Sequence, residues 1–90
     1  MEAYVFIVSG RVQGVGFRWF TEREALKRNI HGYVRNLEDG RVEILAQADS
    51  RSLDEFRESI RRGPSASRVD QVEVRAVEVD LDLRSFLLRF

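Results

Sequence analysis

The peptide Gly10-Arg11-Val12-Gln13-Gly14-Val15-Gly16-Phe17-Arg18 carries three of the six glycines of this 90-residue chain. A β-branched and aromatic segment precedes it at residues 3–9, and a segment with helical spacing follows at residues 17–29. The peptide therefore predicts a glycine-rich loop that joins a strand to a helix. Glycine lets such a loop turn its N–H groups inward, because no Cβ stands in the way. Inward N–H groups, a helix N-terminus and a fixed guanidinium favour an anion site, most naturally for a phosphoryl group.

Arg18 is the residue that distinguishes this loop from an ordinary turn. The loop lacks the Gly-Lys-Ser/Thr ending of a nucleotide-binding P-loop, and Trp19 stands where a dinucleotide fingerprint has its third glycine. Arg18 falls in the first turn of the predicted helix, where a cation opposes the helix dipole. An anion bound between the guanidinium and the loop would explain that placement. From spacing alone, a plain strand-to-helix turn and an anion site stay equally open.

The rest of the chain predicts alternating strands and helices. Two strands, at residues 32–37 and 41–47, are joined by the turn Glu38-Asp39-Gly40, and further strands are expected at 69–79 and 85–90. A second helix is expected at 51–62, with Asp49 or Ser50 as its cap, Gly63-Pro64 as its stop, and an apolar stripe of Leu53, Phe56 and Ile60. The order β-α-β-β-α-β predicts an α+β, ferredoxin-like fold, with a four-stranded antiparallel sheet and two helices on one face.

Two finer features of these elements can be predicted. Trp19, Leu26 and Ile30 fall on one face of the first helix, which we expect to be its buried face. In the strand at 69–79 the apolar positions slip by one residue, which indicates a bulge or a strand end between Arg75 and Val77.

Composition favours one small globular domain that spans residues 1–90. The absence of cysteine excludes disulfides, thiolate catalysis and cysteine-ligated metals. A formal net charge of zero argues against generic nucleic-acid binding, which needs a basic surplus. The apolar run Tyr4–Val8 is too short to cross a membrane, and Glu2 precedes it where a signal peptide would be basic. We therefore expect a cytoplasmic protein with no membrane partner.

Asn36, at the end of the strand after the first helix, is a second candidate site residue. Taken alone, it is most simply a turn-forming asparagine before Glu38-Asp39-Gly40. If its strand lies next to the first strand, the amide would face the glycine loop and could hold a water through its donor and acceptor. His31 is the only histidine, and no cluster has metal-ligand spacing. A reaction at this site must therefore need no metal and little proton transfer.

Over essentially its whole length the chain resembles the acylphosphatases. The peptide Gly10–Arg18 matches the family signature GxVQGVxFR at every fixed position, and Gly32-Tyr33-Val34-Arg35-Asn36 matches a second element at the expected distance. The resemblance implies that Arg18 binds the substrate phosphate, that Asn36 positions the water, and that neither a metal nor an organic cofactor is needed. It also implies a phosphate cradle that is completed by Val12, Gln13, Gly14, Val15, Gly16 and Phe17. Ala48 departs from the family, which usually has glycine there; strain at that turn would affect stability, but we do not expect it to remove activity.

The expected reaction is hydrolysis of the carboxyl-phosphate bond of small acyl phosphates, with inorganic phosphate as product and inhibitor and a monomer as the active form. A carboxylate is a stable leaving group near neutral pH, so the reaction needs no general acid, and its loose transition state calls mainly for positioning and electrostatic stabilisation. One alternative is an anion-binding or carbamoyl-phosphate-binding module of a larger maturation enzyme, whose cysteine-rich zinc segments this chain lacks. A ferredoxin-like nucleic-acid-binding domain would need aromatic residues on the strand at 41–47, which has none.

Overall fold

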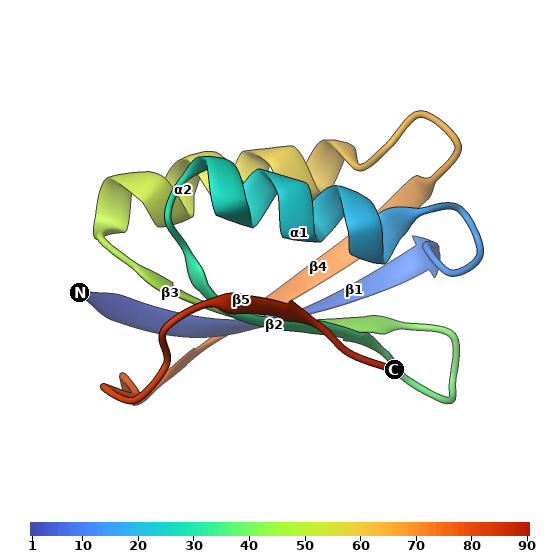
Figure 1. Cartoon of the computed structure of the whole chain (residues 1–90). Coiled ribbons are helices and arrows are strands. Elements are labelled where there is room, and N and C mark those ends of the chain that lie inside the picture. The colour runs from blue at the N-terminus through green and yellow to red at the C-terminus, as the bar shows by residue number, and fades with distance from the viewer.

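In a computed structural model that describes residues 1–90, two helices pack on one face of a five-stranded sheet (Figure 1). The helices are α1 (Phe17–Lys27) and α2 (Ser50–Arg62). The strands are β1 (Glu2–Arg11), β2 (His31–Asn36), β3 (Val42–Ala48), β4 (Arg68–Val77) and β5 (Phe86–Leu88). The predicted ferredoxin-like α+β architecture is confirmed.

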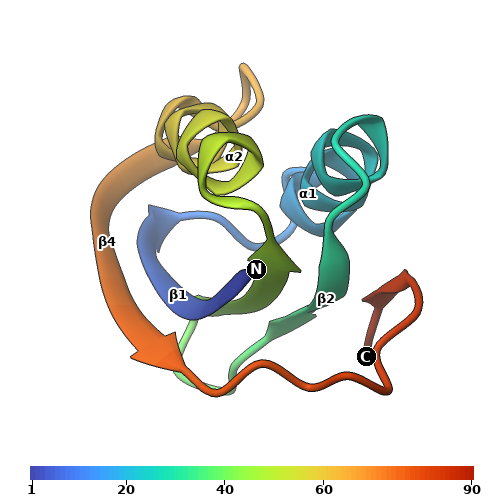
Figure 2. The same ribbon diagram turned by 90° about the vertical axis from the view of Figure 1, so that its left-hand side faces the viewer.

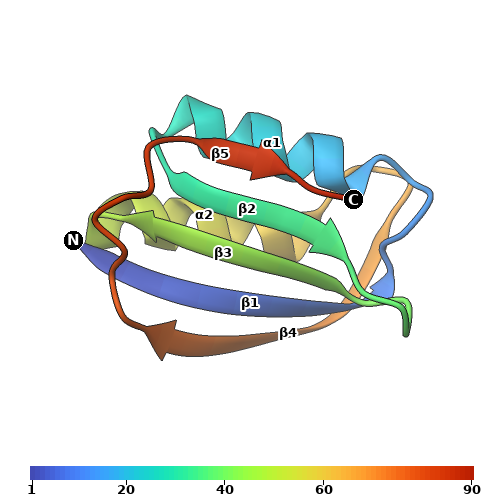
Figure 3. The ribbon, with the colours of Figure 1, turned by 60° about the horizontal axis from the view of Figure 1, so that its bottom comes forward.

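The sheet has the order β4-β1-β3-β2-β5, and its first four strands are antiparallel. The short strand β5 is an addition to the predicted four-stranded sheet, since it pairs parallel to β2 at the edge (Figure 3). The strand of Asn36 does not lie next to the first strand, which was the condition stated for its amide to face the glycine loop, because β3 lies between β1 and β2. Both β1 and β2 run antiparallel to β3, and are therefore parallel to each other. Their C-terminal ends thus lie at the same end of the sheet.

The core lies between the sheet and the two helices, which sit side by side above it (Figure 2). Helix α2 buries the predicted stripe, and Asp49 caps it by accepting a hydrogen bond from the Ser52 N–H at 2.8 Å. Helix α1 buries a different face from the predicted one, made of Phe17, Thr21 and Ala25. Of the predicted face, Ile30 is buried, but Trp19 and Leu26 are 58 % and 57 % exposed. The small Thr21 and Ala25 side chains let this face of α1 lie close to the sheet.

Strand β4 has a bulge, but it lies at the end of the strand opposite to the predicted one. Ser9 pairs with Gln71 and Gly10 pairs with Val69, so Asp70 of β4 is the extra residue. The bulge falls where β1 leads into the glycine loop, and it accounts for the three-residue spacing of Val69 and Val72. The alternative interpretation, a strand end, is correct, since β4 ends at Val77.

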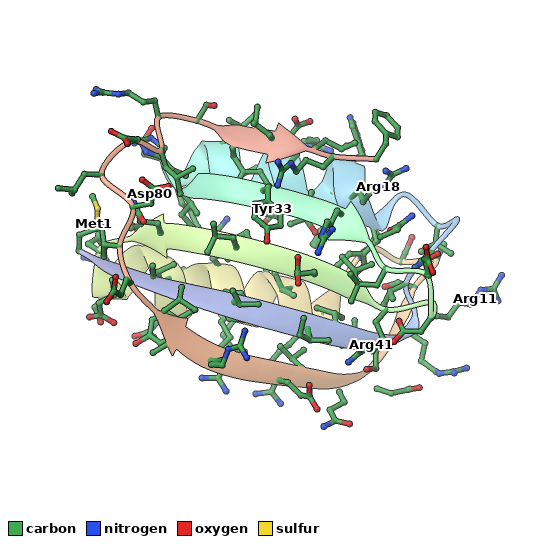
Figure 4. The ribbon with its side chains drawn as sticks, turned by 90° about the horizontal axis from the view of Figure 1, so that it is seen from below. Met1, Arg11, Arg18, Tyr33, Arg41 and Asp80 are labelled. Atoms are coloured by element: carbon green, nitrogen blue, oxygen red, sulfur yellow. The ribbon has the colours of Figure 1, made fainter.

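The connection from β4 to β5 crosses below the sheet and is anchored by polar groups (Figure 4). The amide of the buried Gln47 donates to the Asp80 carbonyl and accepts from the Asp80 N–H, each at 2.8 Å. His31 Nδ1 lies 3.1 Å from the Leu83 carbonyl oxygen. These contacts place β5 beside β2. The strain expected at Ala48 is absent, because Asn29 is the only non-glycine residue with a positive φ.

Gly32→Ala should disrupt the pairing of β2 with β3. Gly32 has φ 148°, and a Cβ there would overlap the backbone carbonyl of Leu45. Gly40 has φ 96° but no heavy atom within 4 Å of a Cβ, so Gly40→Ala is a matched control for backbone strain alone. We expect a loss of about 3 kcal/mol or more in the free energy of unfolding for Gly32→Ala and of about 1 kcal/mol for Gly40→Ala. Equal urea midpoints for the two variants would contradict this.

Candidate functional site

The glycine loop leaves the C-terminal end of β1 and enters α1 at Phe17. Gly14 and Gly16 have φ values of 73° and 79°, in the left-handed region that favours glycine. Gly16 is the N-cap of α1, and no side chain caps the helix or places an acidic group in its first turn. The N–H groups at this helix end therefore lack side-chain acceptors, and their partial positive charge is available to an anion.

The side chain of Gln13 fastens the loop to the hairpin between β2 and β3. Its Nε2 donates to the carbonyl oxygens of Leu37 and Arg41, each at 2.8 Å. Figure 4 shows Arg41 and Arg11 at the same end of the molecule, where the hairpin and the end of β1 meet. Both N–H groups of the Gln13 side-chain amide are thus bonded to the hairpin, and only the backbone N–H of Gln13 is available to the predicted phosphate cradle. Sequence reasoning missed this contact because the bonded residues are 24 and 28 positions away.

Arg18, the second residue of α1, is oriented by the C-terminal segment. Its Nη1 donates to the Arg89 carbonyl at 2.8 Å, and its guanidinium lies 4.8 Å from the centre of the Phe90 ring. The ion pairs of the structure join other residues, so no carboxylate neutralises Arg18. An arginine has five N–H donors, which leaves several free for an anion.

Asn36 is the last residue of β2. Its Oδ1 is buried and accepts no hydrogen bond from the protein. A buried oxygen without a partner costs about 1–3 kcal/mol, so it is well suited to accept from a small polar molecule.

The loop, Arg18 and Asn36 meet in one hollow of about 180 Å³. Its lining consists of Val12, Gly14, Gly16, Phe17, Arg18, Trp19, Asn36 and Leu88. Of the predicted cradle, Gln13 and Val15 do not line the hollow, and Val15 packs against the core instead. Trp19 and Leu88 line it without having been predicted as site residues. For Leu88 the sequence held no signal, because its place depends on the parallel pairing of β5.

The hollow offers hydrogen-bond donors but no carboxylate, imidazole or hydroxyl side chain for proton transfer. No group of three or more His, Cys, Asp or Glu residues is arranged to hold a metal ion. The arrangement can bind an anion through backbone N–H groups and a guanidinium, and it can hold a small polar molecule beside that anion at Asn36.

Known proteins share the sequence pattern and the fold of this chain. A sequence model of the acylphosphatase family matches residues 4–87. An acylphosphatase of Chlorobaculum tepidum is 54 % identical over 80 residues, which cover 89 % of this chain and 87 % of the relative. The crystal structure of acylphosphatase from Bacillus subtilis superposes with a TM-score of 0.96 at 41 % identity, covering all of both chains. The structure of full-length HypF in its phosphate- and nucleotide-bound form gives a TM-score of 0.91 at 33 % identity, over 99 % of this chain and 12 % of that one.

The chain belongs to the acylphosphatase family. Its activity is that of the family, the hydrolysis of acyl phosphates.

Replacing Gln13 should loosen the loop and lower activity together. Gln13→Ala removes one of the two donors of each hairpin carbonyl, since backbone N–H groups also donate to both. The loss of two hydrogen bonds should cost about 1–3 kcal/mol of stability and reduce kcat/KM for acetyl phosphate. Gln13→Glu should be worse at equal size, because a carboxylate cannot donate to either carbonyl. Gln71→Ala, at an exposed glutamine of β4, is the control. The role given to Gln13 is wrong if Gln13→Glu keeps wild-type stability and kcat/KM.

Proposed function

We propose that the backbone N–H groups of Val12–Phe17 and the Arg18 guanidinium bind the phosphoryl group of an acyl phosphate, while Asn36 orients the attacking water. The observation that carries this proposal is that the glycine loop, Arg18 and Asn36 line one hollow. These residues come from the end of β1, the start of α1 and the end of β2. Anion donors and a water-binding amide therefore face a common space.

The phosphoryl group is held by positive charge at a fixed place. The N-terminus of α1, which no side chain caps, supplies N–H groups and the positive end of the helix dipole. Arg18 supplies a planar fork of donors that matches two phosphoryl oxygens. In the loose transition state, charge spreads over the equatorial oxygens, and donors that are already in place stabilise it without reorganisation.

The water is held by the Asn36 amide. Its buried Oδ1 lacks a protein partner and can accept a hydrogen bond from the water. An amide cannot serve as a base near neutral pH, so a phosphoryl oxygen takes the proton of the water. As the water oxygen bonds to phosphorus, the bond from phosphorus to the acyl oxygen breaks and its electron pair leaves with the carboxylate. The products are the carboxylate and inorganic phosphate, and no general acid is required.

The domain organisation, oligomeric state, location and product inhibition of the protein form part of the same proposal. Residues 1–90 act as a single domain and as a monomer in the cytoplasm, with inorganic phosphate as product and competitive inhibitor. Neither helix has the length and apolar composition needed to span a membrane. The zero formal net charge supports the absence of nucleic acid among the partners.

Arg18 and Asn36 should give different kinetic signatures. Arg18→Ala should lower kcat/KM for acetyl phosphate by about 10²–10³-fold and weaken inhibition by phosphate, and Arg18→Lys should recover little because one ammonium cannot reproduce the fork. Asn36→Ala should lower kcat by about 10²-fold with little change in phosphate inhibition. Steady-state kinetics and unfolding curves of the variants test both. Near-normal activity of Arg18→Ala, or lost phosphate affinity with normal kcat in Asn36→Ala, would contradict the assigned roles.

Activity should persist in excess chelator and should favour acyl phosphates over alkyl phosphomonoesters. An alkyl ester expels a high-pKa alkoxide and would need a general acid, which the lining of the hollow does not contain. Rates on acetyl phosphate and on an alkyl phosphomonoester, each with and without EDTA, make the comparison. Similar rates on the two substrates, or loss of acetyl phosphate hydrolysis on chelation, would overturn the metal-free, acid-free mechanism.

A further inference from the structure

The hollow has an apolar side that a phosphoryl group does not need. Trp19 of α1 and Leu88 of β5 both line it, beside the donors of the loop and Arg18. Trp19 is 58 % exposed, and Leu88 is partly buried against the core. A phosphoryl group is polar on every side, so its binding gives no reason for a large aromatic side chain at this place.

Both apolar side chains are held in position. The Arg23 guanidinium lies 4.5 Å from the centre of the Trp19 ring, one helical turn further along α1, and restrains the indole through a cation–π contact. Leu88 pairs with Val34 across the parallel strands, and the next N–H, that of Arg89, donates to the Val34 carbonyl at 2.8 Å. The backbone of Leu88 is thus fixed, and its side chain packs against the core. Residues held in this way lose little further freedom when a ligand packs on them.

We propose that Trp19 and Leu88 form the subsite for the acyl group, and that the chain prefers aryl and bulky apolar acyl phosphates to acetyl phosphate. This inference rests on the proposed function, because the acyl group is joined through one bridging oxygen to the phosphoryl group held by the loop and Arg18. The acyl group must therefore lie in the same hollow or at its mouth. Among the lining residues, Trp19 and Leu88 are the apolar side chains that are not fully buried.

The size of the acyl group determines how much it gains from this subsite. An acetyl group offers one methyl, whereas a benzoyl group offers a ring that can stack on or against the edge of the indole. Contacts of this kind change binding by about two- to twelvefold. Because the acyl group keeps the contact in both the bound substrate and the transition state, the effect should fall mainly on KM.

The test compares kcat/KM for benzoyl phosphate and acetyl phosphate in the wild type and in Trp19→Ala, Trp19→Phe and Leu88→Ala. Leu26→Ala is the matched control, since Leu26 is 57 % exposed on the same helix but lies outside the lining. We expect the benzoyl-to-acetyl ratio to fall about two- to twelvefold in Trp19→Ala, with inhibition by inorganic phosphate unchanged. Trp19→Phe should keep most of the ratio, and Leu26→Ala should keep all of it.

Trp19 is the only tryptophan of the chain, so its fluorescence gives a second readout that needs no turnover. Phenylphosphonate should change the Trp19 emission more than methylphosphonate does at equal saturation. Equal emission changes, or an unchanged substrate ratio in Trp19→Ala while both substrates are still hydrolysed, would overturn the subsite alone. A ratio that falls as much in Leu26→Ala as in Trp19→Ala would overturn it as well. Failure of the wild type to hydrolyse either substrate would instead overturn the proposed function.

Discussion

Two carbonyl groups of the β2–β3 hairpin share one side-chain amide, that of Gln13. The sheet order makes this contact possible, because β1 and β2 are separated by β3 and yet end at the same edge. Leu37, which accepts one of the two bonds, directly follows Asn36. The amide therefore links the glycine loop to the hairpin that follows the residue proposed to hold the water. Without it, no side-chain hydrogen bond would join the glycine loop to the hairpin.

The positive charge at the site works against the stability of the free protein. Arg18 stands at the positive end of α1, and no acidic residue of the first turn and no ion pair offsets it. In place of a carboxylate, the Arg89 carbonyl and the Phe90 ring contact the Arg18 guanidinium. They orient it while leaving several of its N–H donors free. Such an arrangement is unfavourable in the absence of a bound anion. A residue that lowers local stability, as Arg18 does here, is expected mainly at a functional site.

Patterns within single elements predicted most of the fold and the candidate residues of the site. The spacing of Leu53, Phe56 and Ile60 indicated the buried face of α2, and the glycine loop with Arg18 indicated an anion site. Apolar residues were misleading on α1, where Trp19 and Leu26 are exposed. The small Thr21 and Ala25 carry no strong hydrophobic signal, although they decide which face of the helix can approach the sheet.

What the sequence could not predict depends on which strands are neighbours. The parallel addition of β5 brings Leu88 to the hollow, and the pairing of β1 with β4 places the bulge at Asp70 rather than near Val77. The two hydrogen bonds of the Gln13 amide join the loop to the hairpin, so neither segment indicates them alone. Each of these features is a contact between distant parts of the chain, and no local periodicity reports it.

The glycine loop and Arg18 are proposed to form one anion site together. A ¹H–¹⁵N NMR titration with inorganic phosphate tests it most directly. We expect the amide signals of Gly14–Phe17 and the Arg18 Nε–H signal to shift together and to saturate with one dissociation constant. A second hollow, lined in part by Arg57 and Arg61 between α2 and β4, is a competing place for an anion. Shifts confined to that region, with the loop signals unchanged, would contradict the account.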